Sequence, residues 1–277
     1  DRKFIEIVNS EAEHKDGHFV MPLPFREDDV AMPFNRVLAA KRAESQKRKM
    51  LSNESYHKDY VAFVEDLLSK GYAKVVPQNE IKCRKGKVWY LPHHGVYHAQ
   101  KPGRVRVVFD CSSRYMGISL NDCLLQGPDL TNNLWGVLTR FRFSEIAFVA
   151  DLEAMFYQVK VPVADRCYLR FLWWSDHLLG GSVCEYQMTV HIFGASSSPS
   201  VANFIKKIAT SGQCNQMIEQ IIKHGFYVDD CLYSVSEATA CQQLIVELRR
   251  TFKNHGFHLT KFNSNDRSVL SSVPIEE

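Results

Sequence analysis

The chain has 277 residues, of which 45% are hydrophobic and 23% are charged, and its formal net charge is +3. This composition can bury a full core, which excludes a disordered chain and suits one large domain or two lobes. The charge is only mildly basic. Any attraction to a polyanion must therefore come from local clusters of Lys and Arg.

The cysteines, histidines and apolar runs exclude further classes. Eight cysteines are scattered without a C-x-x-C pair, which predicts free thiols in a reducing compartment. The eleven histidines lack the cysteine spacing of a zinc site. No apolar run reaches the roughly 20 residues of a membrane span, so no membrane partner is expected. Because the chain starts at Asp1, we expect a piece of a longer polypeptide.

Residues 1–53 are predicted to be an N-terminal linker and a basic helix. Residues 1–33 are polar and contain several prolines, which predicts an extended linker. The pattern becomes helical from Phe34 to Leu51, over a run of cations: Lys41, Arg42, Lys47, Arg48 and Lys49. A solvated helix face is the ordinary interpretation of such a run, and phosphate contact is the alternative.

Short helices and strands alternate in the next part of the chain. Apolar residues recur at helical spacing over residues 54–70, and Gly71 is a natural helix stop. Strand-like runs follow at 73–76, 88–91 and 105–110. Helical spacing returns over 131–143, where Thr131 is a plausible N-cap, and the apolar strand 146–151 ends in Asp151.

The remaining elements predict an α+β fold. Two β-rich runs cover 167–174 and 183–190. A long helix is expected from Ser198, as its N-cap, to about His224. A hairpin, a helix over 236–256 and a strand over 257–262 complete the order. This order suits a sheet with helices on one face, as in a ferredoxin-like core.

Three carboxylates define the candidate site. Asp229 and Asp230 lie between apolar flanks in "GFYVDDCLYSV", and a solvated hairpin turn is the plain interpretation of that pair alone. In a β-α-β core, however, the strand end at Asp151 can lie beside the hairpin tip. Converging carboxylates repel one another unless they are protonated or bind a cation. Oxygen ligands favour Mg²⁺ or Mn²⁺, and two such ions serve phosphoryl transfer.

Four segments resemble the palm motifs of reverse transcriptases, in the same order. They are "FVADLEAMFYQVKV", "FGASSSPS", "FYVDDCLYSV" and "GFHLTKF", and "YVDD" is a usual signature of that family. The upstream segment "YLPHHGVYHAQKPGRVRVVFDCSSRYMGISLNDCLLQGPDL" resembles the fingers of BEL/Pao-type LTR retrotransposons. The resemblance covers nearly the whole chain, and the N-terminal stretch is similar to the linker after that polyprotein's protease.

The resemblance implies a right-hand fold of fingers and palm with a ferredoxin-like palm sheet and an absent or truncated thumb. The implied divisions are fingers at 54–127 and 160–198, and palm at 128–159 and 199–277, the last including the start of a thumb connection. The implied activity is that of an RNA-directed DNA polymerase, a nucleotidyltransferase. The alternative is an inactive retroelement-derived fragment that binds nucleic acid or protein.

The implied cofactors are two Mg²⁺ ions, with Mn²⁺ as a substitute, held by Asp151, Asp229 and Asp230. The implied partners are an RNA or DNA template with its primer, dNTPs, and the protease, RNase H and integrase segments of the polyprotein. The implied location is a retroelement particle in the cytoplasm, with the nucleus as the alternative.

Other residues take roles from the same resemblance. Phe156 falls at the steric-gate position, and Lys261 is in the region that supplies a lysine near the leaving pyrophosphate as a general acid. Nucleotide contacts are implied for Lys101, Arg104, Arg106, Phe193, Gly194 and the carbonyl of Leu152. Primer-grip or template contacts are implied for Tyr227, Val228 and Ser198.

Each role has a structural alternative. Phe156 could be core packing, and Arg106 could be a surface residue on the alternating face of a strand. Phe193 stands where the retroviral motif has Gln, so no glutamine hydrogen bond is implied here. "GASSS" does not fit G-x-S-x-G, so a serine hydrolase is not supported.

Overall fold

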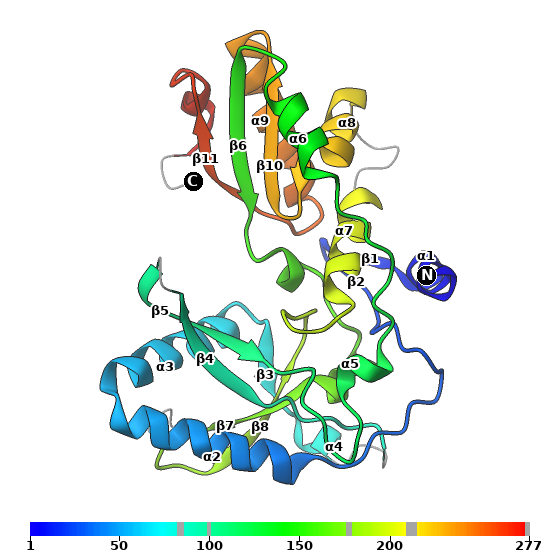
Figure 1. The fold of residues 1–277 in the computed structure, drawn as a ribbon, viewed down its shortest axis with the longest axis vertical. Helices are drawn as coiled ribbons and strands as arrows, with labels where there is room; N and C mark the ends of the chain where they lie inside the picture. The colour runs from blue at the N-terminus through cyan, green and yellow to red at the C-terminus, as the bar shows by residue number, and fades with distance from the viewer. Residues whose placement is uncertain (82–85, 99–100, 176–178, 209–214, 275–277) are drawn as a thin grey trace. The chain divides into compact units, whose positions relative to one another are not determined.

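The structure, a computed structural model, describes residues 1–81, 86–98, 101–175, 179–208 and 215–274; the side chains of residue 98 and residues 101–104 lie outside the description. The chain divides into two compact units (Figure 1). Unit 1 comprises Asp1–Ile7, Met21–Gln126 and Lys160–Ser198, and unit 2 comprises Val8–Val20, Gly127–Val159 and Pro199–Glu277. No helix in the described ranges is long and apolar enough to cross a membrane.

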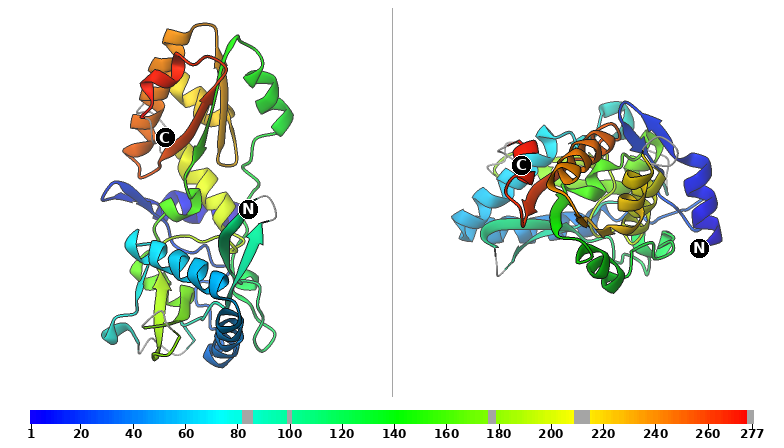
Figure 2. Two further views of the ribbon diagram at one scale, coloured as in Figure 1. Left: turned by 90° about the vertical axis from the view of Figure 1, so that its left-hand side faces the viewer. Right: turned by 90° about the horizontal axis from the view of Figure 1, so that it is seen from above.

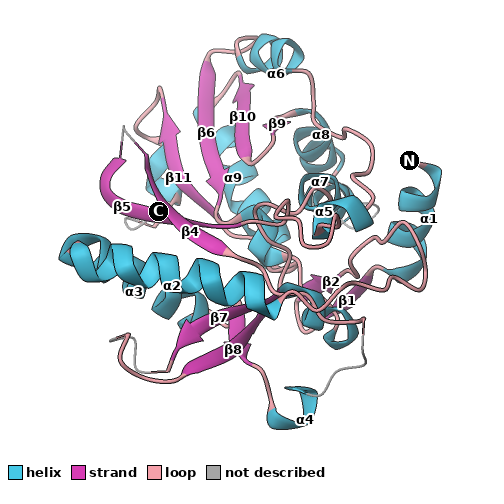
Figure 3. Cartoon of the chain, turned by 60° about the horizontal axis from the view of Figure 1, so that its bottom comes forward, coloured by secondary structure: helices cyan, strands magenta, loops and turns pink. Residues whose placement is uncertain are grey.

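Unit 1 contains a three-stranded antiparallel sheet of order β3-β8-β7 and a separate hairpin of β4 and β5. Its elements are α2 (Arg36–Ser52), α3 (Glu54–Ser69), β3 (Ala73–Val75), α4 (Gln78–Ile81), β4 (His93–His98), β5 (Lys101–Phe109), α5 (Leu120–Cys123), the 3₁₀ helix η2 (Val163–Leu169), β7 (Arg170–Trp174) and β8 (Val183–Met188). Helices α2 and α3 lie side by side and pack against strands of both sheets (Figure 3).

An aromatic cluster forms the core of unit 1. The ring of Trp173 stacks on Tyr60, with centroids 5.3 Å apart, and the Tyr60 hydroxyl hydrogen-bonds the buried His93 at 2.5 Å. The predicted strand at 88–91 is wrong, because its residues are buried beside η2 and β7 without forming a ladder. Only an isolated bridge joins Tyr90 to Arg170, and the strand itself begins at His93.

Unit 2 contains a four-stranded antiparallel sheet of order β11-β6-β10-β9. Its elements are β1 (Glu13–Lys15), β2 (His18–Val20), α6 (Leu134–Phe141), β6 (Ile146–Leu152), η1 (Met155–Gln158), α7 (Ser198–Ile208), α8 (Gln216–His224), β9 (Phe226–Tyr227), β10 (Asp230–Val235), α9 (Ala238–Lys253), β11 (Leu259–Ser264) and η3 (Val269–Ser272). This order, with helices between the first and second and between the third and fourth strands, is the ferredoxin-like topology that the sequence predicts. Helix α9 packs on β6, β10 and β11, and α8 packs on α9 and β9 (Figure 2).

Three other sequence-based predictions are wrong. Residues 1–33 are not all an extended linker, because α1 (Arg2–Glu11) and the β1–β2 hairpin form there and bury apolar side chains: Phe4, Val8 and Phe19. The N-cap of α6 is Asn133 and not Thr131, since the Asn133 side chain accepts from the Gly136 amide. The helix expected from Ser198 to His224 is two helices, because Asn215 has a non-helical backbone, with φ −53° and ψ 141°, and its side chain caps α8.

Candidate active site

Two of the three predicted carboxylates face each other across neighbouring strands. Asp230, the first residue of β10, pairs with Asp151 near the end of β6. Asp230 also pairs with Tyr227 on β9, and Asp151 pairs with Thr260 on β11. Directly paired residues of antiparallel strands point to the same face of a sheet. These four side chains therefore form one row across the sheet of unit 2.

The row lies on the face of the sheet that α9 leaves open. Along β6 the side chains of Phe148, Ala150 and Leu152 are buried, and α9 packs on this strand. Side chains alternate between the two faces of a strand. Asp151, between Ala150 and Leu152, therefore points away from α9. The apolar alternation of "IAFVADL" thus places one carboxylate on the open face.

A tight turn presents the third carboxylate. Strands β9 and β10 are joined by Val228 and Asp229 alone, and Val228 adopts a left-handed backbone with φ +55°. The Leu152 amide donates a hydrogen bond of 2.9 Å to the carbonyl oxygen of Asp229, which ties the turn to the end of β6. Asp229 is thereby held beside the row that contains Asp151 and Asp230.

The charges of Asp229 and Asp151 act on Asp230. The pKa of Asp230 is raised above its ordinary value, first by burial and then by the negative charges of Asp229 and Asp151. Lys261 opposes that shift. Its ammonium donates a 2.7 Å hydrogen bond to Oδ1 of Asp151, in an ion pair that leaves the lysine largely exposed. Lys261 lies in a bulge of β11 with φ +55°.

The oxygen atoms of the three carboxylates are suitable ligands for a hard divalent cation, but their side chains are not placed to bind one together. Neighbouring carboxylates that raise a pKa are the usual setting for bound metal. Among the described residues, however, no group of three or more His, Cys, Asp or Glu side chains is placed to hold a metal ion. A cation held by all three aspartates therefore requires their side chains to move closer together.

Lys206 is a site residue that the sequence analysis missed. It lies on α7, only 2% exposed, and its ammonium donates a 2.6 Å hydrogen bond to the carbonyl oxygen of Val228. It also lies 4.7 Å from the centre of the Phe226 ring. Burial lowers the pKa of Lys206 to about 7. The available signal was its position, since Lys206 follows Ala202 by four residues on the buried side of an amphipathic helix.

Arg106 lies in unit 1, in the middle of β5. Its side chain is exposed, whereas its neighbours Val105 and Val107 are buried, as alternation along a strand requires. Within the described part of the chain the guanidinium makes no ion pair. This geometry leaves Arg106 available to an anionic ligand and is equally that of a surface strand residue. The side chains of Lys101 and Arg104 lie outside the described residues.

Phe193 and Gly194 also belong to unit 1. Phe193 is 46% exposed. Gly194 has φ +108°, and a Cβ there would collide with the carbonyl oxygen of Phe109. Its own carbonyl accepts a 3.0 Å hydrogen bond from the Asn121 side chain. Glycine at this position is therefore required by the fold, whether or not it contacts a nucleotide.

Phe156 and Ser198 have different surroundings. Phe156 lies in η1 of unit 2 and is partly exposed, whereas Met155, Tyr157 and Gln158 beside it are buried. Phe156 is therefore not a fully buried core aromatic. Ser198 is completely buried at the start of α7, and its hydroxyl has no hydrogen-bond partner among the described residues.

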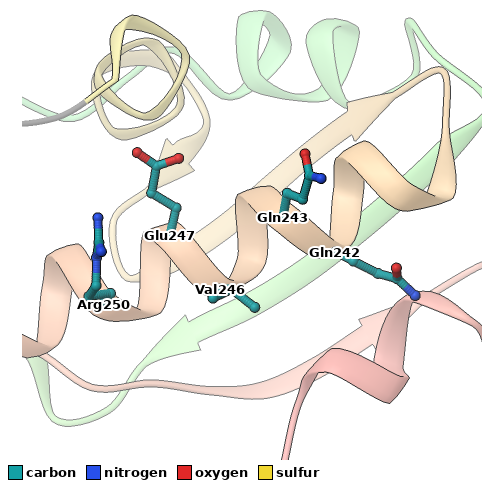
Figure 4. Close-up of a pocket in the computed structure, with 5 residues that line it drawn as sticks. All are labelled: Gln242, Gln243, Val246, Glu247 and Arg250. Atoms are coloured by element: carbon teal, nitrogen blue, oxygen red, sulfur yellow. The ribbon is translucent and has the colours of Figure 1, made fainter.

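A shallow hollow of about 370 Å³ lies on the outer side of α9 (Figure 4). All of its lining side chains come from that helix: Gln242, Gln243, Val246, Glu247 and Arg250. Because α9 covers the other face of the sheet, this hollow is separate from the aspartates.

Solved structures with similar folds identify the architecture. The chain resembles foamy viral protease-reverse transcriptase dRH in complex with double-stranded DNA, with a TM-score of 0.54, 15% identity, and coverage of 87% of this chain and 33% of that one. The chain has a reverse-transcriptase fold. For foamy viral protease-reverse transcriptase with an RNA/DNA hybrid, the TM-score is 0.53, the identity 12%, and the coverage 91% and 27%. For a selenomethionine-labelled CSH mutant of prototype foamy virus protease-reverse transcriptase, the TM-score is 0.53 and the identity 17%, and the match covers 93% of this chain and 29% of that one.

The likeness to these reverse transcriptases shows the fold and not the activity, because the identities are low. The chain spans about a third or less of the length of those chains. No family model and no curated protein matches the sequence. The sheet of unit 2 can nevertheless be called the palm sheet of this fold.

Proposed function

We propose that the chain is an RNA-directed DNA polymerase that extends a primer with dNTPs, as the reverse transcriptase domain of a BEL/Pao-type retrotransposon polyprotein. One observation carries the proposal. Asp151 and Asp230 are paired across the open face of the palm sheet, and the two-residue turn beside them presents Asp229. The "YVDD" motif and the reverse-transcriptase fold support the same activity.

In this proposal the aspartates supply oxygen ligands at the end of β6 and at the hairpin. Two Mg²⁺ ions, when bound, would activate the primer 3′-hydroxyl and neutralise the triphosphate and the departing pyrophosphate. Lys261, 2.7 Å from Oδ1 of Asp151, would supply a positive charge beside the reacting phosphates and is the candidate general acid. Leu152 supports the site through the hydrogen bond that its backbone amide donates to the carbonyl oxygen of Asp229.

The other candidate residues would select the substrate. Arg106 presents an exposed fork of donors suited to triphosphate oxygens. Phe156 would lie under the sugar and exclude a 2′-hydroxyl. Tyr227, at the outer end of the aspartate row, would contact the primer.

A second candidate function rests on the ion pair between Lys261 and Asp151. That pair neutralises Asp151 without a metal, and the described residues contain no ready group of three metal ligands. A catalytically inactive retroelement-derived module that binds nucleic acid or a protein would be compatible with both facts.

Primer extension on an RNA template separates the two functions. The polymerase proposal predicts incorporation of dNTPs in Mg²⁺ or Mn²⁺, and loss of incorporation in Asp229→Asn without any fall in melting temperature. The matched control is Asp129→Asn. Asp129 is an exposed carboxylate of the same unit that accepts a hydrogen bond from the Thr131 amide, and this variant should extend the primer normally. A wild-type chain that binds primer-template but never extends it would favour the inactive module.

A further inference from the structure

Helix α2 carries a concentration of positive charge that the catalytic site does not use. It contains six basic residues and one acidic residue: Arg36, Lys41, Arg42, Lys47, Arg48 and Lys49, with Glu44. The whole chain has a net charge of only +3. Local charge of this kind decides attraction to a polyanion when the global charge is near zero.

Four of these cations share one side of the helix. Lys41 and Arg42 are followed seven residues later by Arg48 and Lys49, and seven residues make two turns of an α-helix. Ser45 and Ser52 fall on the same side by the same spacing. We call these six residues the basic stripe.

The basic stripe points away from the core of unit 1. The buried residues of α2 are Ala39, Ala43 and Met50, which lie about half a turn from the stripe. All four cations of the stripe are exposed. Packing of the apolar side therefore fixes which side of α2 faces outward.

The stripe cations have no acidic partner in the described structure. None of the ion pairs formed among the described residues involves Lys41, Arg42, Arg48 or Lys49. The Lys49 ammonium lies over the ring of Tyr56, 4.1 Å from its centroid. The neighbouring helix α3 behaves differently, since its Lys58 lies within 3.6 Å of Glu54.

We propose that the basic stripe of α2 binds the phosphate backbone of a nucleic-acid strand. This inference rests on the proposed function, because it assigns a contact surface for that function's template or primer. Two pairs of cations separated by roughly 10 Å along the helix axis span about three phosphate steps, or about four phosphates, along one strand of a duplex at 3.4 Å per step. The serine hydroxyls between them are further phosphate donors.

The competing interpretation is that the basic stripe is only a solvated helix face. The outer side of α9 provides an example of such a face in this chain. There Gln242, Gln243, Glu247 and Arg250 mix polar, acidic and basic groups (Figure 4). Mixed signs are normal for a solvated surface. The basic stripe has four exposed cations and only one acidic residue beside it, Glu44, which is why we assign it to a polyanion.

The salt dependence of binding tests the proposal. The full chain and its quadruple variant K41Q/R42Q/R48Q/K49Q are titrated with a labelled RNA, alone and annealed to a DNA primer, between about 50 and 200 mM salt. Each lost phosphate contact should remove about 0.7 to 0.9 from the slope of log K against log salt concentration, so the slope should fall by about three. At about 100 mM salt the affinity should fall at least about tenfold.

The matched control removes the same number of exposed cations from unit 2, in R142Q/R250Q/K253Q/R267Q. It should change the slope less than the stripe variant does. Equal losses in the two variants, or an unchanged slope in the stripe variant with an intact circular dichroism spectrum, would overturn the proposal. Retained RNA affinity with lost binding to vesicles containing phosphatidylserine would mark the stripe as a membrane contact and also overturn it.

Failure of the basic-stripe proposal can be distinguished from failure of the polymerase proposal. Asp229→Asn should keep the affinity and salt slope of the wild-type chain for primer-template. The stripe variant should raise the apparent KM for primer-template in parallel with its loss of affinity. Extension that survives Asp229→Asn would end the polymerase proposal and leave the basic stripe standing.

Discussion

The ammonium of Lys206 donates a hydrogen bond of 2.6 Å to the carbonyl oxygen of Val228. Val228 has a left-handed backbone and immediately precedes Asp229. A buried cation on α7 therefore holds the turn that carries Asp229 and leads into Asp230. An amine with few alternative partners fixes that carbonyl more firmly than water would.

Lys206→Met should alter both the pH dependence of stability and turnover. Because burial lowers the pKa of Lys206 to about 7, the unfolded chain binds more protons between pH 7 and 10.5. The free energy of unfolding should therefore gain a contribution as pH rises through that window, and the gain should vanish in the variant. Loss of the hydrogen bond should loosen the turn and lower kcat by about tenfold or more.

Denaturant unfolding and single-turnover kinetics on the same preparations measure these two effects. Lys207→Met is the control, because Lys207 is only half-buried and donates to Leu130 instead of the turn. It should leave kcat unchanged. An identical pH profile in wild type and Lys206→Met would show that the ammonium is not buried as described.

Asp230→Asn should stabilise the fold. The raised pKa of Asp230 means that the folded chain binds more protons than the unfolded one above the ordinary value of 3.8. The protonated Asp230 side chain is therefore the form that the folded state favours. This contribution to the free energy of unfolding is lost as pH rises from 3.8 through the folded pKa, and it is absent at neutral pH. The variant should melt at a higher temperature at pH 7, with no difference below pH 3.8.

Asp266→Asn provides a control of opposite sign. Hydrogen bonds from the Ser268 hydroxyl and amide lower the pKa of Asp266, so its removal should reduce stability at pH 7. Added Mg²⁺ should raise the melting temperature of the wild type more than that of Asp230→Asn. A lower melting temperature for Asp230→Asn at pH 7 would contradict the electrostatic account.

Arg106→Ala should weaken use of the incoming nucleotide. Loss of a charge-assisted hydrogen bond should cost on the order of 1.5 to 3 kcal/mol in kcat/KM for dNTP, mainly through KM if ground and transition states are contacted alike. Arg114→Ala, which removes an exposed cation paired with Asp122, should not change dNTP kinetics. Normal dNTP kinetics in a folded Arg106→Ala would return Arg106 to an ordinary surface strand residue.

Phe156→Val should admit ribonucleotides. If the ring excludes a 2′-hydroxyl, the ratio of kcat/KM for dGTP over rGTP should fall at least about tenfold, or roughly 1.4 kcal/mol. Phe148→Val, at a fully buried position of β6, should lower the melting temperature and leave that ratio unchanged. A destabilised Phe156→Val with unaltered sugar preference would show that Phe156 only packs.

The sequence predicted the palm sheet better than it predicted what supports the site. Apolar alternation in two strands predicted that Asp151 and Asp230 could meet at one end of the sheet, whereas the register that pairs them joins strands distant in sequence. The position of Lys206 could not be predicted in the same way. A lysine in a helix is usually solvated, and only packing of α7 against the turn buries this one.

Long-range packing also explains the other errors. Phe4 and Val8 are completely buried although they lie in a polar segment. The ion pair of Lys261 with Asp151, beside a bulge in β11, likewise has no local signal in the sequence, and the role of Lys261 near pyrophosphate stays a prediction. The prediction of the fold rests on many local preferences that agree with one another, so it holds even where single elements are predicted wrongly.

The Mg²⁺ dependence of single-nucleotide incorporation on an RNA template tests the central claim most directly. Wild-type chain should add dGTP opposite template cytosine only when Mg²⁺ or Mn²⁺ is present, and Asp151→Asn should lose this activity while retaining its melting temperature and primer-template affinity. Incorporation that persists in excess chelator, or in a folded Asp151→Asn, would contradict the assignment of the palm-sheet aspartates to metal-dependent nucleotidyl transfer.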